Sequence, residues 1–385
     1  MHIFLLAGEA SGDALGGKLM QSLQQKQSNN IRFSGVGGPR MSEKGLTSIF
    51  PMEELSLIGF VEIIPHIPHL LKRIDLVVDT ILEQKPDVVV TIDAPAFNKR
   101  VAKKLRKKGC TIPLVHYVAP TVWAYKPKRA EKMAKLFDHL LVILPFEPPF
   151  FEKEGLATTY IGHPIVEESV SDGDGHSFRD QHNIPPESPT ICIMPGSRNG
   201  ELKRLLPVIS NTVDIVQDKF SDLHVIILAT SRFEKRLQEE TTSWSAPVTV
   251  TSNISDRANA IAACDIALAK SGTGTLELAI AKLPMVVMYK VNPISAWMLK
   301  RMIRVPYVNL INLVLNQPAI PELLQENCTA EKLSASLLKL LDSAEAQEEQ
   351  KQAMHQAMTQ MGYNQSPAPS DRAADAILNI IQPSS

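Results

Sequence analysis

Short runs of Val, Ile and Leu recur along this 385-residue chain, and most are followed by a turn of Gly, Pro, Ser or Asp and then by a helical pattern. The runs lack polar alternation, which is typical of parallel strands buried on both faces of a sheet. The repeated strand–helix order therefore predicts an α/β fold with doubly wound parallel sheets. The expected strands are His2–Ala7, Asp87–Ile92, Pro113–Val118, His139–Leu144, Thr190–Met194, His224–Leu228, Ile266–Ala269 and Met285–Tyr289.

The length of the chain predicts two such domains. Residues 171–176 (SDGDGH) have the composition of a linker, and the segment PPESP follows before the next strand. A Gln-rich stretch and a last amphipathic helix, at about Ser370–Ile381, come after residue 345. We therefore expect an N-terminal Rossmann-like domain at 1–170, a linker at 171–189, a C-terminal Rossmann-like domain at 190–345 and C-terminal helices at 346–385.

The distribution of charge limits the partners of the chain. Its formal net charge is −1, so the whole molecule is not an electrostatic binder of nucleic acid. Residues 1–165 carry 21 Lys and Arg against 16 Asp and Glu, whereas the remainder carries 19 against 25. The two halves therefore face different partners, or one of them faces an anionic surface. The four cysteines match no zinc-binding spacing, which favours buried free thiols in a reducing cytoplasm.

The sequence has neither the features of a signal peptide nor a run of about 18 apolar residues, so we expect any membrane contact to be peripheral. Residues 55–73 are nevertheless unusually apolar, and basic clusters lie at 99–108 and 126–135. One interpretation is a core helix with two solvated helix faces. The other is an apolar entry for acyl chains beside a basic rim that meets anionic phospholipid. The pattern alone leaves both interpretations open.

Two loops of the first half follow predicted strands and carry polar residues. GEASGDALG at 8–16 is neither a dinucleotide fingerprint nor a P-loop. Its glycines allow a close approach to a ligand, or it is a tight turn in which Ser11 or Asp13 caps the next helix. Asp93 ends another strand, where apolar neighbours would make it a stronger general base. The alternative is that Asp93 only caps the following helix.

Two loops of the second half combine glycines with hydroxyl groups at strand ends. In PGSRNGE at 195–201, backbone N–H groups and the Arg198 guanidinium are the groups that hold a diphosphate. In KSGTGTLE at 270–277, N–H groups at a helix start can take phosphate oxygens, while Glu277 can accept from ribose hydroxyls. Together these loops predict a site for a nucleoside diphosphate sugar.

The sequence lacks the residue patterns of metal-binding sites and of serine hydrolases. His66 and His69 have no carboxylate or thiol partner in the pattern, and no Asp-x-Asp ends a strand, so we expect no bound metal. No Gly-x-Ser-x-Gly motif is present, which disfavours a serine hydrolase.

Motifs spread over nearly the whole chain resemble, in order, those of the lipid-A-disaccharide synthase family, a GT-B glycosyltransferase family (family 19). They are GEASGD at 8–13, GVGGPRM at 35–41, IDAPAFN at 92–98, HYVAPTVWAY at 116–125, LPFE at 144–147, IGHP at 161–164, PGSRNGE at 195–201 and SGTGTLE at 271–277. The resemblance implies an α/β protein of two Rossmann-like domains that face each other across a cleft, with the C-terminal helix crossing back to the first domain.

The implied activity is that of an inverting hexosyltransferase in lipid A biosynthesis. It transfers 2,3-diacylglucosamine from its UDP derivative to 2,3-diacylglucosamine 1-phosphate (lipid X), giving a β-1,6-linked disaccharide 1-phosphate and UDP. No metal and no cofactor are expected. The resemblance further implies peripheral contact with anionic phospholipid at the cytoplasmic face of the inner membrane, and it allows a homodimer.

The resemblance also assigns residues. The essential aspartate of the family falls on Asp93, the expected general base. The expected donor (UDP) contacts are Gly196, Ser197, Arg198, Glu201, Ser271, Gly272, Thr273, Thr275, Glu277 and Asn312. The acceptor side, facing the acylated sugar, is expected to include Glu9, Ser11, Gly12 and Asp13.

Two rival functions remain at this point. One is a UDP-GlcNAc 2-epimerase of the non-hydrolysing type, which shares the GT-B fold and the UDP site but needs no lipid acceptor. The other is a non-catalytic lipid or nucleotide-sugar binding protein, in which Asp93 would serve stability rather than rate.

Overall fold

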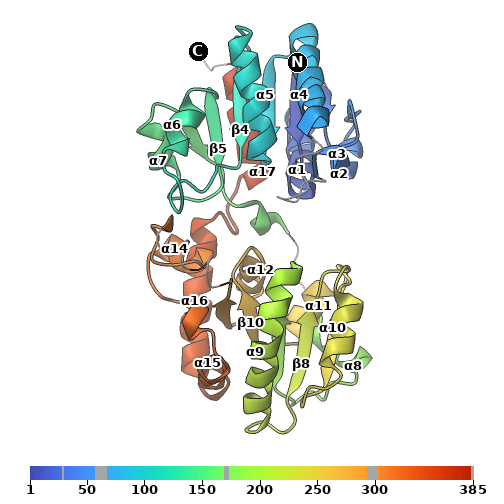
Figure 1. Ribbon diagram of the computed structural model, residues 1–385, viewed down its shortest axis with the longest axis vertical. Coiled ribbons are helices and arrows are strands. Elements are labelled where there is room, and N and C mark those ends of the chain that lie inside the picture. Colours follow the sequence, from blue (N-terminus) through green and yellow to red (C-terminus); the bar gives the residue numbers. More distant parts are fainter. Residues whose placement is uncertain (28–29, 57–66, 169–172, 293–295, 297–301, 383–385) are drawn as a thin grey trace. The chain divides into compact units, whose positions relative to one another are not determined.

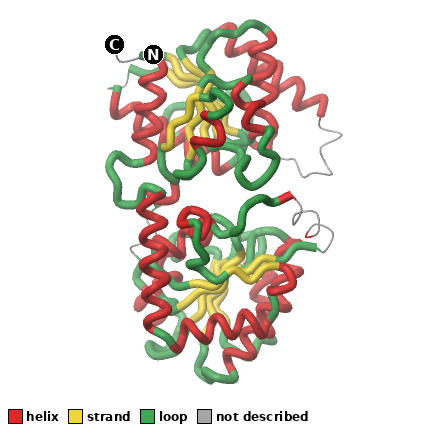
Figure 2. Tube along the Cα trace, turned by 90° about the vertical axis from the view of Figure 1, so that its left-hand side faces the viewer, coloured by secondary structure: helices red, strands yellow, loops and turns green. Residues whose placement is uncertain are grey.

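The computed structural model describes residues 1–27, 30–56, 67–168, 173–292, 296 and 302–382. The chain divides into two compact units, Met1–Pro164 with Asn364–Ser385 and Ile165–Tyr363. Each unit contains one six-stranded sheet whose strands are all parallel. Figure 2 shows each sheet as a layer of strands with helices packed around it. The predicted doubly wound α/β class is therefore confirmed.

The sheet of the first unit has the strand order β2-β1-β3-β4-β5-β6. Its strands are β1 (His2–Ala7), β2 (Arg32–Val36), β3 (Val88–Ile92), β4 (Leu114–Tyr117), β5 (His139–Val142) and β6 (Ala157–Tyr160). The helices are α1 (Ala10–Lys26), α2 (Pro39–Ser42), α3 (Glu53–Ser56), α4 (Ile67–Gln84), α5 (Pro95–Lys107), α6 (Arg129–Ala134), α7 (Pro148–Glu152) and α17 (Pro369–Ile381) (Figure 1).

Burial explains why these segments form the core of the first unit. All five residues of β3 are buried, and so are residues 3–7 of β1, so both strands are enclosed on both faces. Helix α4 packs against α5, and α1 packs against α17. Helix α17 contributes Ala373, Ala374 and Ile377 to the same hydrophobic core. The C-terminal helix thus returns to the first unit.

The sheet of the second unit has the strand order β12-β11-β10-β7-β8-β9. Its strands are β7 (Thr190–Met194), β8 (His224–Leu228), β9 (Val248–Thr251), β10 (Ile266–Lys270), β11 (Met285–Tyr289) and β12 (Glu322–Leu324). Its helices are α8 (Gly175–Gln181), α9 (Asn199–Gln217), α10 (Glu234–Thr241), α11 (Arg257–Ala262), α12 (Gly274–Ile280), α14 (Leu310–Leu315), α15 (Ala330–Asp342) and α16 (Ala344–Gln360) (Figure 1).

The units begin and end at residues other than the predicted ones. Part of the expected 171–189 linker forms α8, where Phe178 is buried and the Arg179 guanidinium donates to the carbonyls of Ala263, Pro185, Pro186 and Ser188. Helix α16 also belongs to the second unit, because the Gln350 side chain accepts from the N–H of Met285 at the start of β11. Only residues from Asn364 onward return to the first unit.

The apolar stretch 55–73 is described only at its ends, because residues 57–66 lie outside the described residues. Its C-terminal part forms the first turns of α4. There, Arg73 donates to both oxygens of Glu54 at 2.6 and 2.9 Å, and His69 lies 2.6 Å from the same carboxylate. The expectation that His69 has no carboxylate partner is therefore wrong, because α4 lies beside the short helix α3.

Candidate active site

The turn after β3 holds Asp93 in an unusual backbone conformation. Asp93 and Ala94 both have positive φ, 48° and 40°, which side chains other than Gly rarely adopt. The Asp93 N–H donates to the carbonyl of Tyr117 at the end of β4 (2.9 Å). The buried Asn98 side chain donates to the carbonyls of Asp93 (2.7 Å) and Ile92 (3.2 Å). Tyr117 on β4 and Asn98 on α5 thus hold the backbone of Asp93 from two sides.

Two predicted acceptor-side residues lie beside Asp93. The Ser11 hydroxyl donates to Asp93 Oδ2 at 3.1 Å. Partial burial, and then the negative charge of Asp93, raise the pKa of Glu9. Strands β1 and β3 are neighbours, so their carboxyl ends bring the two loops together. This is where ligands bind in open parallel sheets.

The capping alternatives for these residues do not hold. The residue before α5 is Ala94, and no side chain caps that helix end, so Asp93 is not its cap. Helix α1 likewise begins after Glu9 without a side-chain cap, which excludes Ser11 and Asp13 from that role. The polar residues of these loops must therefore be explained by something other than capping of α1 or α5.

Asp13 makes structural contacts within the first unit. It is 3% exposed, and its carboxylate accepts from the N–H groups of Gly38 (2.8 Å), Arg40 (2.9 Å) and Met41 (3.0 Å). All of these donors lie at the start of α2, which explains why GEASGD and GVGGPRM occur in one chain. Gly12 is buried against β3, where a Cβ would lie 3.3 Å from the Ile92 carbonyl oxygen. Of the acceptor-side residues, the structure brings Glu9 and Ser11 to Asp93 but turns Asp13 inward.

The first loop of the second unit is organised by Glu201. Gly196 has φ +113° and a Cβ there would collide with the Glu201 carboxylate, so glycine is required. Glu201 Oε2 accepts from the N–H groups of Ser197 (3.0 Å) and Arg198 (3.3 Å). Ser197 and Arg198 are themselves exposed. The buried Glu201 carboxylate therefore holds the backbone of the loop in place. The side chains of Ser197 and Arg198 remain exposed to solvent.

Lys270 connects this loop to the second one and was not among the predicted site residues. Its Nζ lies 3.3 Å from Glu201 Oε1, and both side chains are mostly buried. Burial acts to raise the pKa of Glu201, but the charge of Lys270 and the Ser197 N–H lower it overall. Lys270 is the last residue of β10, which pairs with β7. The only sequence signal was a charge at the end of an otherwise apolar strand.

Some of the predicted residues in the second loop are exposed, and others are buried or hydrogen-bonded within the protein. Gly272 and Thr273 are exposed, whereas Thr275 is fully buried and its hydroxyl donates to the Gly272 carbonyl at 2.7 Å. The Ser271 hydroxyl donates to the Val308 carbonyl at 3.1 Å. Glu277 forms an ion pair with Arg257 on α11, which orients its carboxylate.

The Asn312 side chain is buried and hydrogen-bonded within the second unit. It is 1% exposed, and its amide exchanges hydrogen bonds with the backbone of Ile320 and donates to Glu322. Neighbouring Asn309 is equally buried, but its Nδ2 has no partner among the described residues. Asn309 directly follows Val308, whose carbonyl accepts from Ser271 in the second loop.

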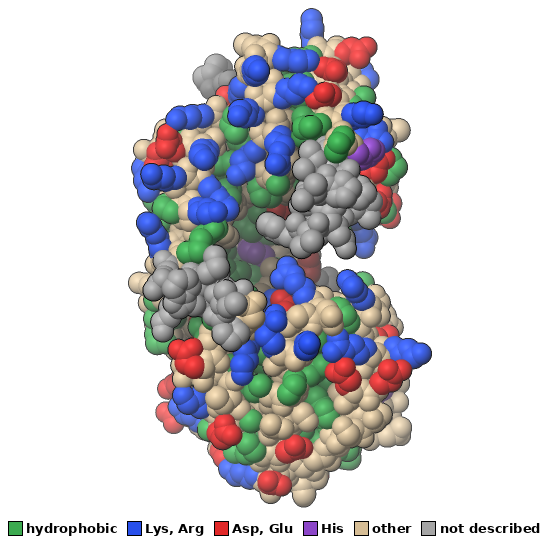
Figure 3. Space-filling model, viewed as in Figure 1, with side chains coloured by type: hydrophobic (Ala, Val, Ile, Leu, Met, Phe, Trp, Pro, Cys, Tyr) green, Lys and Arg blue, Asp and Glu red, His purple; other side chains and the backbone are tan. Residues whose placement is uncertain are grey.

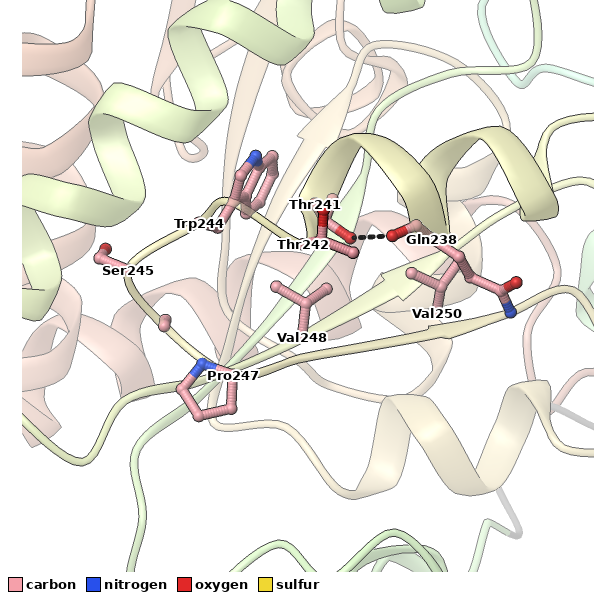
Figure 4. Close-up of a pocket in the computed structure, with 9 residues that line it drawn as sticks. Gln238, Thr241, Thr242, Trp244, Ser245, Pro247, Val248 and Val250 are labelled. Carbon is pink, nitrogen blue, oxygen red and sulfur yellow. Dashed lines mark hydrogen bonds between the residues drawn. The ribbon is translucent and has the colours of Figure 1, made fainter.

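A surface cavity of about 440 Å³ lies elsewhere in the second unit, between α10 and β9 (Figure 4). Its lining includes Trp244 and Pro247 of the loop that precedes β9, together with Val248 and Val250 of β9. Ligand sites of parallel sheets lie at the opposite, carboxyl ends of strands. The Thr241 and Ser245 hydroxyls beside it already donate to Leu237 and Asp214. None of the predicted site residues lines this cavity.

Two further features concern metals and membranes. Within the described part of the chain, no three His, Cys, Asp or Glu side chains are grouped so that they could hold a metal ion. Among the described helices, none is long and apolar enough to cross a membrane.

Known proteins match this chain over nearly its whole length. The family model for lipid-A-disaccharide synthetase matches residues 3–377. A lipid-A-disaccharide synthase of Rhodospirillum centenum is 46% identical over 379 residues, covering 98% of this chain and 94% of that protein. One from Paramagnetospirillum magneticum is 41% identical over 384 residues, covering 99% and 98%.

Solved structures support the fold. Acinetobacter baumannii MurG aligns with a TM-score of 0.57 at 16% identity, covering 98% of this chain and 99% of that one. The UDP-GlcNAc 2-epimerase of Neisseria meningitidis, solved with UDP-GlcNAc, aligns with a TM-score of 0.62 at 12% identity, covering 98% and 99%. At these identities the likeness concerns the fold, which is that of GT-B glycosyltransferases and epimerases. The family model and the relatives decide further: the chain belongs to the lipid-A-disaccharide synthase family.

Proposed function

We propose that this chain transfers 2,3-diacylglucosamine from UDP-2,3-diacylglucosamine to the 6-hydroxyl of 2,3-diacylglucosamine 1-phosphate. The products are a β-1,6-linked disaccharide 1-phosphate and UDP. Membership of the family supports the reaction. The observation that carries the assignment of the site is the Asp93 turn, whose two left-handed non-glycine residues are held by Asn98 and Tyr117. Such strain persists where the surrounding structure imposes it, often at active sites.

Asp93 is the general base of the proposed mechanism. Its carboxylate takes the proton of the attacking 6-hydroxyl as that oxygen bonds to the anomeric carbon and the bond to UDP breaks. A single displacement of this kind inverts the anomeric configuration. Ser11 donates to Asp93 Oδ2, which leaves Oδ1 as the oxygen better placed to accept the proton.

The donor is proposed to bind at the loops after β7 and β10. Ser197, Arg198, Gly272 and Thr273 are exposed there, and the Arg198 guanidinium supplies two donors to diphosphate oxygens. Arg198 is 78% exposed, so its 3.3 Å contact with Glu201 is weak and does not compete with a diphosphate. Positive charge at this position stabilises the UDP leaving group, which is an electrostatic contribution to catalysis.

Peripheral contact with anionic phospholipid at the cytoplasmic face of the inner membrane is also proposed. Lys and Arg side chains gather on the side of the first unit that carries α5 and α6 (Figure 3). Lys103 and Lys107 on α5, and Lys128 and Lys132 at the start of α6, are exposed. Each such residue contributes about 1 kcal/mol of attraction to an anionic leaflet.

The test is UDP release by the purified protein from UDP-2,3-diacylglucosamine, with and without lipid X, in detergent containing EDTA. We expect release that depends on the acceptor, together with a disaccharide 1-phosphate product. Release without acceptor would indicate a hydrolase. A protein that binds UDP, releases none and interconverts UDP-GlcNAc with its 2-epimer would instead be an epimerase.

A further inference from the structure

Arg204 lies in the second turn of α9, and its side chain points back to the start of that helix. Long helical side chains extend toward the N-terminus, and the residue four positions before Arg204 is Gly200. The guanidinium lies over this glycine: a Cβ there would be 3.0 Å from Arg204 Nη2 and 3.6 Å from both Cζ and Nη1. Arg204 therefore reaches the 195–201 loop from outside it.

A second contact places the same guanidinium at the carboxyl end of the sheet. Arg204 Nε donates to the carbonyl of Lys290, which directly follows β11, at 3.3 Å. Strand β10 lies between β7 and β11, and its last residue, Lys270, begins the 270–277 loop. A side chain that contacts both the loop after β7 and the end of β11 passes the end of β10. The Arg204 guanidinium thus lies beside both loops to which the donor is assigned.

The charge of Arg204 is not balanced by a carboxylate. Glu201 is the acidic residue nearest to it in sequence, but the Glu201 carboxylate contacts Lys270 and Arg198, each at 3.3 Å. Within the described part of the chain, no carboxylate pairs with Arg204, and neither Nη1 nor Nη2 donates to another residue. Three cations and one carboxylate therefore meet at the 195–201 loop, and a bound anion would offset the excess positive charge.

The sheet topology indicates which part of the donor Arg204 meets. The chain passes from β7 through β8 to β9 at one edge, then returns to β10 and continues to β11 toward the other edge. Because such connections are right-handed, α9 and α12 cover opposite faces of the sheet. Glu277, to which the ribose hydroxyls are assigned, lies in the first turn of α12 and pairs with Arg257. Arg204 is therefore on the face away from the ribose, where the second phosphate of the diphosphate lies.

We propose that Arg204 binds the β-phosphate of the UDP-sugar, alongside Arg198. This inference rests on the proposed function, in which the donor carries that diphosphate. When the bond from the anomeric carbon to the β-phosphate oxygen breaks, its electron pair stays on that oxygen, so negative charge grows there. The Nη1 and Nη2 groups of Arg204 can donate two hydrogen bonds to this phosphate, which stabilises the leaving group. Arg204 lies outside the motifs that resemble the family.

The experiment is calorimetry of the full chain with UDP and with UMP, two nucleotides that differ by the β-phosphate. The wild type should bind UDP more tightly than UMP. Arg204→Met should lower the affinity for UDP about 10- to 100-fold, as expected for loss of a charged hydrogen-bond donor, and change that for UMP less than about twofold. Its kcat with UDP-2,3-diacylglucosamine and lipid X should also fall, while the thermal midpoint stays at the wild-type value.

Lys203→Met is the matched control, because Lys203 is next to Arg204 on α9, has the same charge and is exposed. It should leave both affinities unchanged. Arg204→Lys keeps the positive charge without the planar fork, and it should show the same selective loss for UDP at a smaller size.

Equal losses for UDP and UMP would overturn the inference, because they would mean that Arg204 only joins α9 to the end of β11. Unchanged UDP affinity in Arg204→Met, or the same loss in Lys203→Met, would also overturn it. A wild type that binds both nucleotides as expected but releases no UDP with lipid X would refute the proposed function and leave the phosphate contact standing.

Discussion

At the scale of single residues, the Asp93 turn shows how backbone strain positions a reactive group. A left-handed conformation at a non-glycine residue costs of order 1–3 kcal/mol, and here two successive residues adopt it. Asn98 offsets this cost by donating to both carbonyls at the end of β3. Gly8 is required nearby, since a Cβ there would approach the Ala94 Cβ to 2.9 Å. The carboxylate direction is therefore set by the main chain.

Asp93→Asn keeps the shape of the side chain but removes its basicity. We expect kcat to fall about 10²- to 10⁴-fold, because a general base contributes a factor of that size. The thermal midpoint and UDP affinity should stay at wild-type values, since Asp93 caps no helix. Rates come from UDP release with lipid X as acceptor. Near wild-type turnover would remove Asp93 from the mechanism, and a loss of stability instead of rate would favour the binding-protein alternative.

At the scale of secondary-structure elements, the buried carboxylate of Asp13 joins α1 to the start of α2. In Asp13→Asn, one acceptor oxygen becomes an NH₂ group that faces backbone N–H donors. We expect the first unit to lose about 1–3 kcal/mol of unfolding free energy, the cost of unpaired buried donors. Urea unfolding measures this, with UDP binding as the control. Unchanged stability together with lost activity would restore the acyl-sugar role for Asp13.

Lys270 connects two elements of the second unit, because at the end of β10 it pairs with Glu201 in the first turn of α9. Lys270→Met leaves the buried Glu201 with less opposing charge, so its pKa rises and the 195–201 loop loses its support. We expect UDP affinity by calorimetry to fall about tenfold, equivalent to about 1.4 kcal/mol. Lys203→Met removes an exposed lysine from α9 and should leave affinity unchanged. Equal affinities for both variants would show that this pair does not support the donor loop.

At the scale of the whole molecule, buried titratable groups make stability depend on pH in opposite directions. Burial lowers the pKa of His116 to about 3 and of His163 to about 4. Below about pH 6.5 the unfolded chain binds protons at these positions and the native protein does not, so stability falls as pH falls. Burial raises the pKa of Glu147 to about 7, so between about pH 4.5 and 7 this group reduces stability as pH rises.

His116→Gln isolates one of these contributions. The wild-type slope from His116 is up to about 1.4 kcal/mol per pH unit between about pH 6.5 and 3, because one proton binds only to the unfolded chain. The variant should show a shallower fall in unfolding free energy over that range, measured by urea titrations at several pH values. An identical slope in both proteins would mean that His116 is not held neutral in the native state.

The strands predicted from the sequence are all present, and four of them have identical bounds: β1, β7, β8 and β11. The strands that went unpredicted are β2, β6, β9 and β12, which are the edges of the two sheets. All residues of β12 and most of β6 and β9 are only half-buried. A continuous apolar run arises only where a strand is covered on both faces and both sides, so edge strands do not carry it.

The fold class, the family motifs and the strand ends at which polar residues collect can all be read from the sequence, because they follow from local composition and order. The contacts that residues of those motifs make with one another are visible only in the folded chain. Asp13 accepts hydrogen bonds from the start of α2, Asn312 donates to Glu322, and Lys270 pairs with Glu201. Each role depends on a contact between residues distant in sequence, brought together by parallel strand pairing, and no local pattern records such a contact.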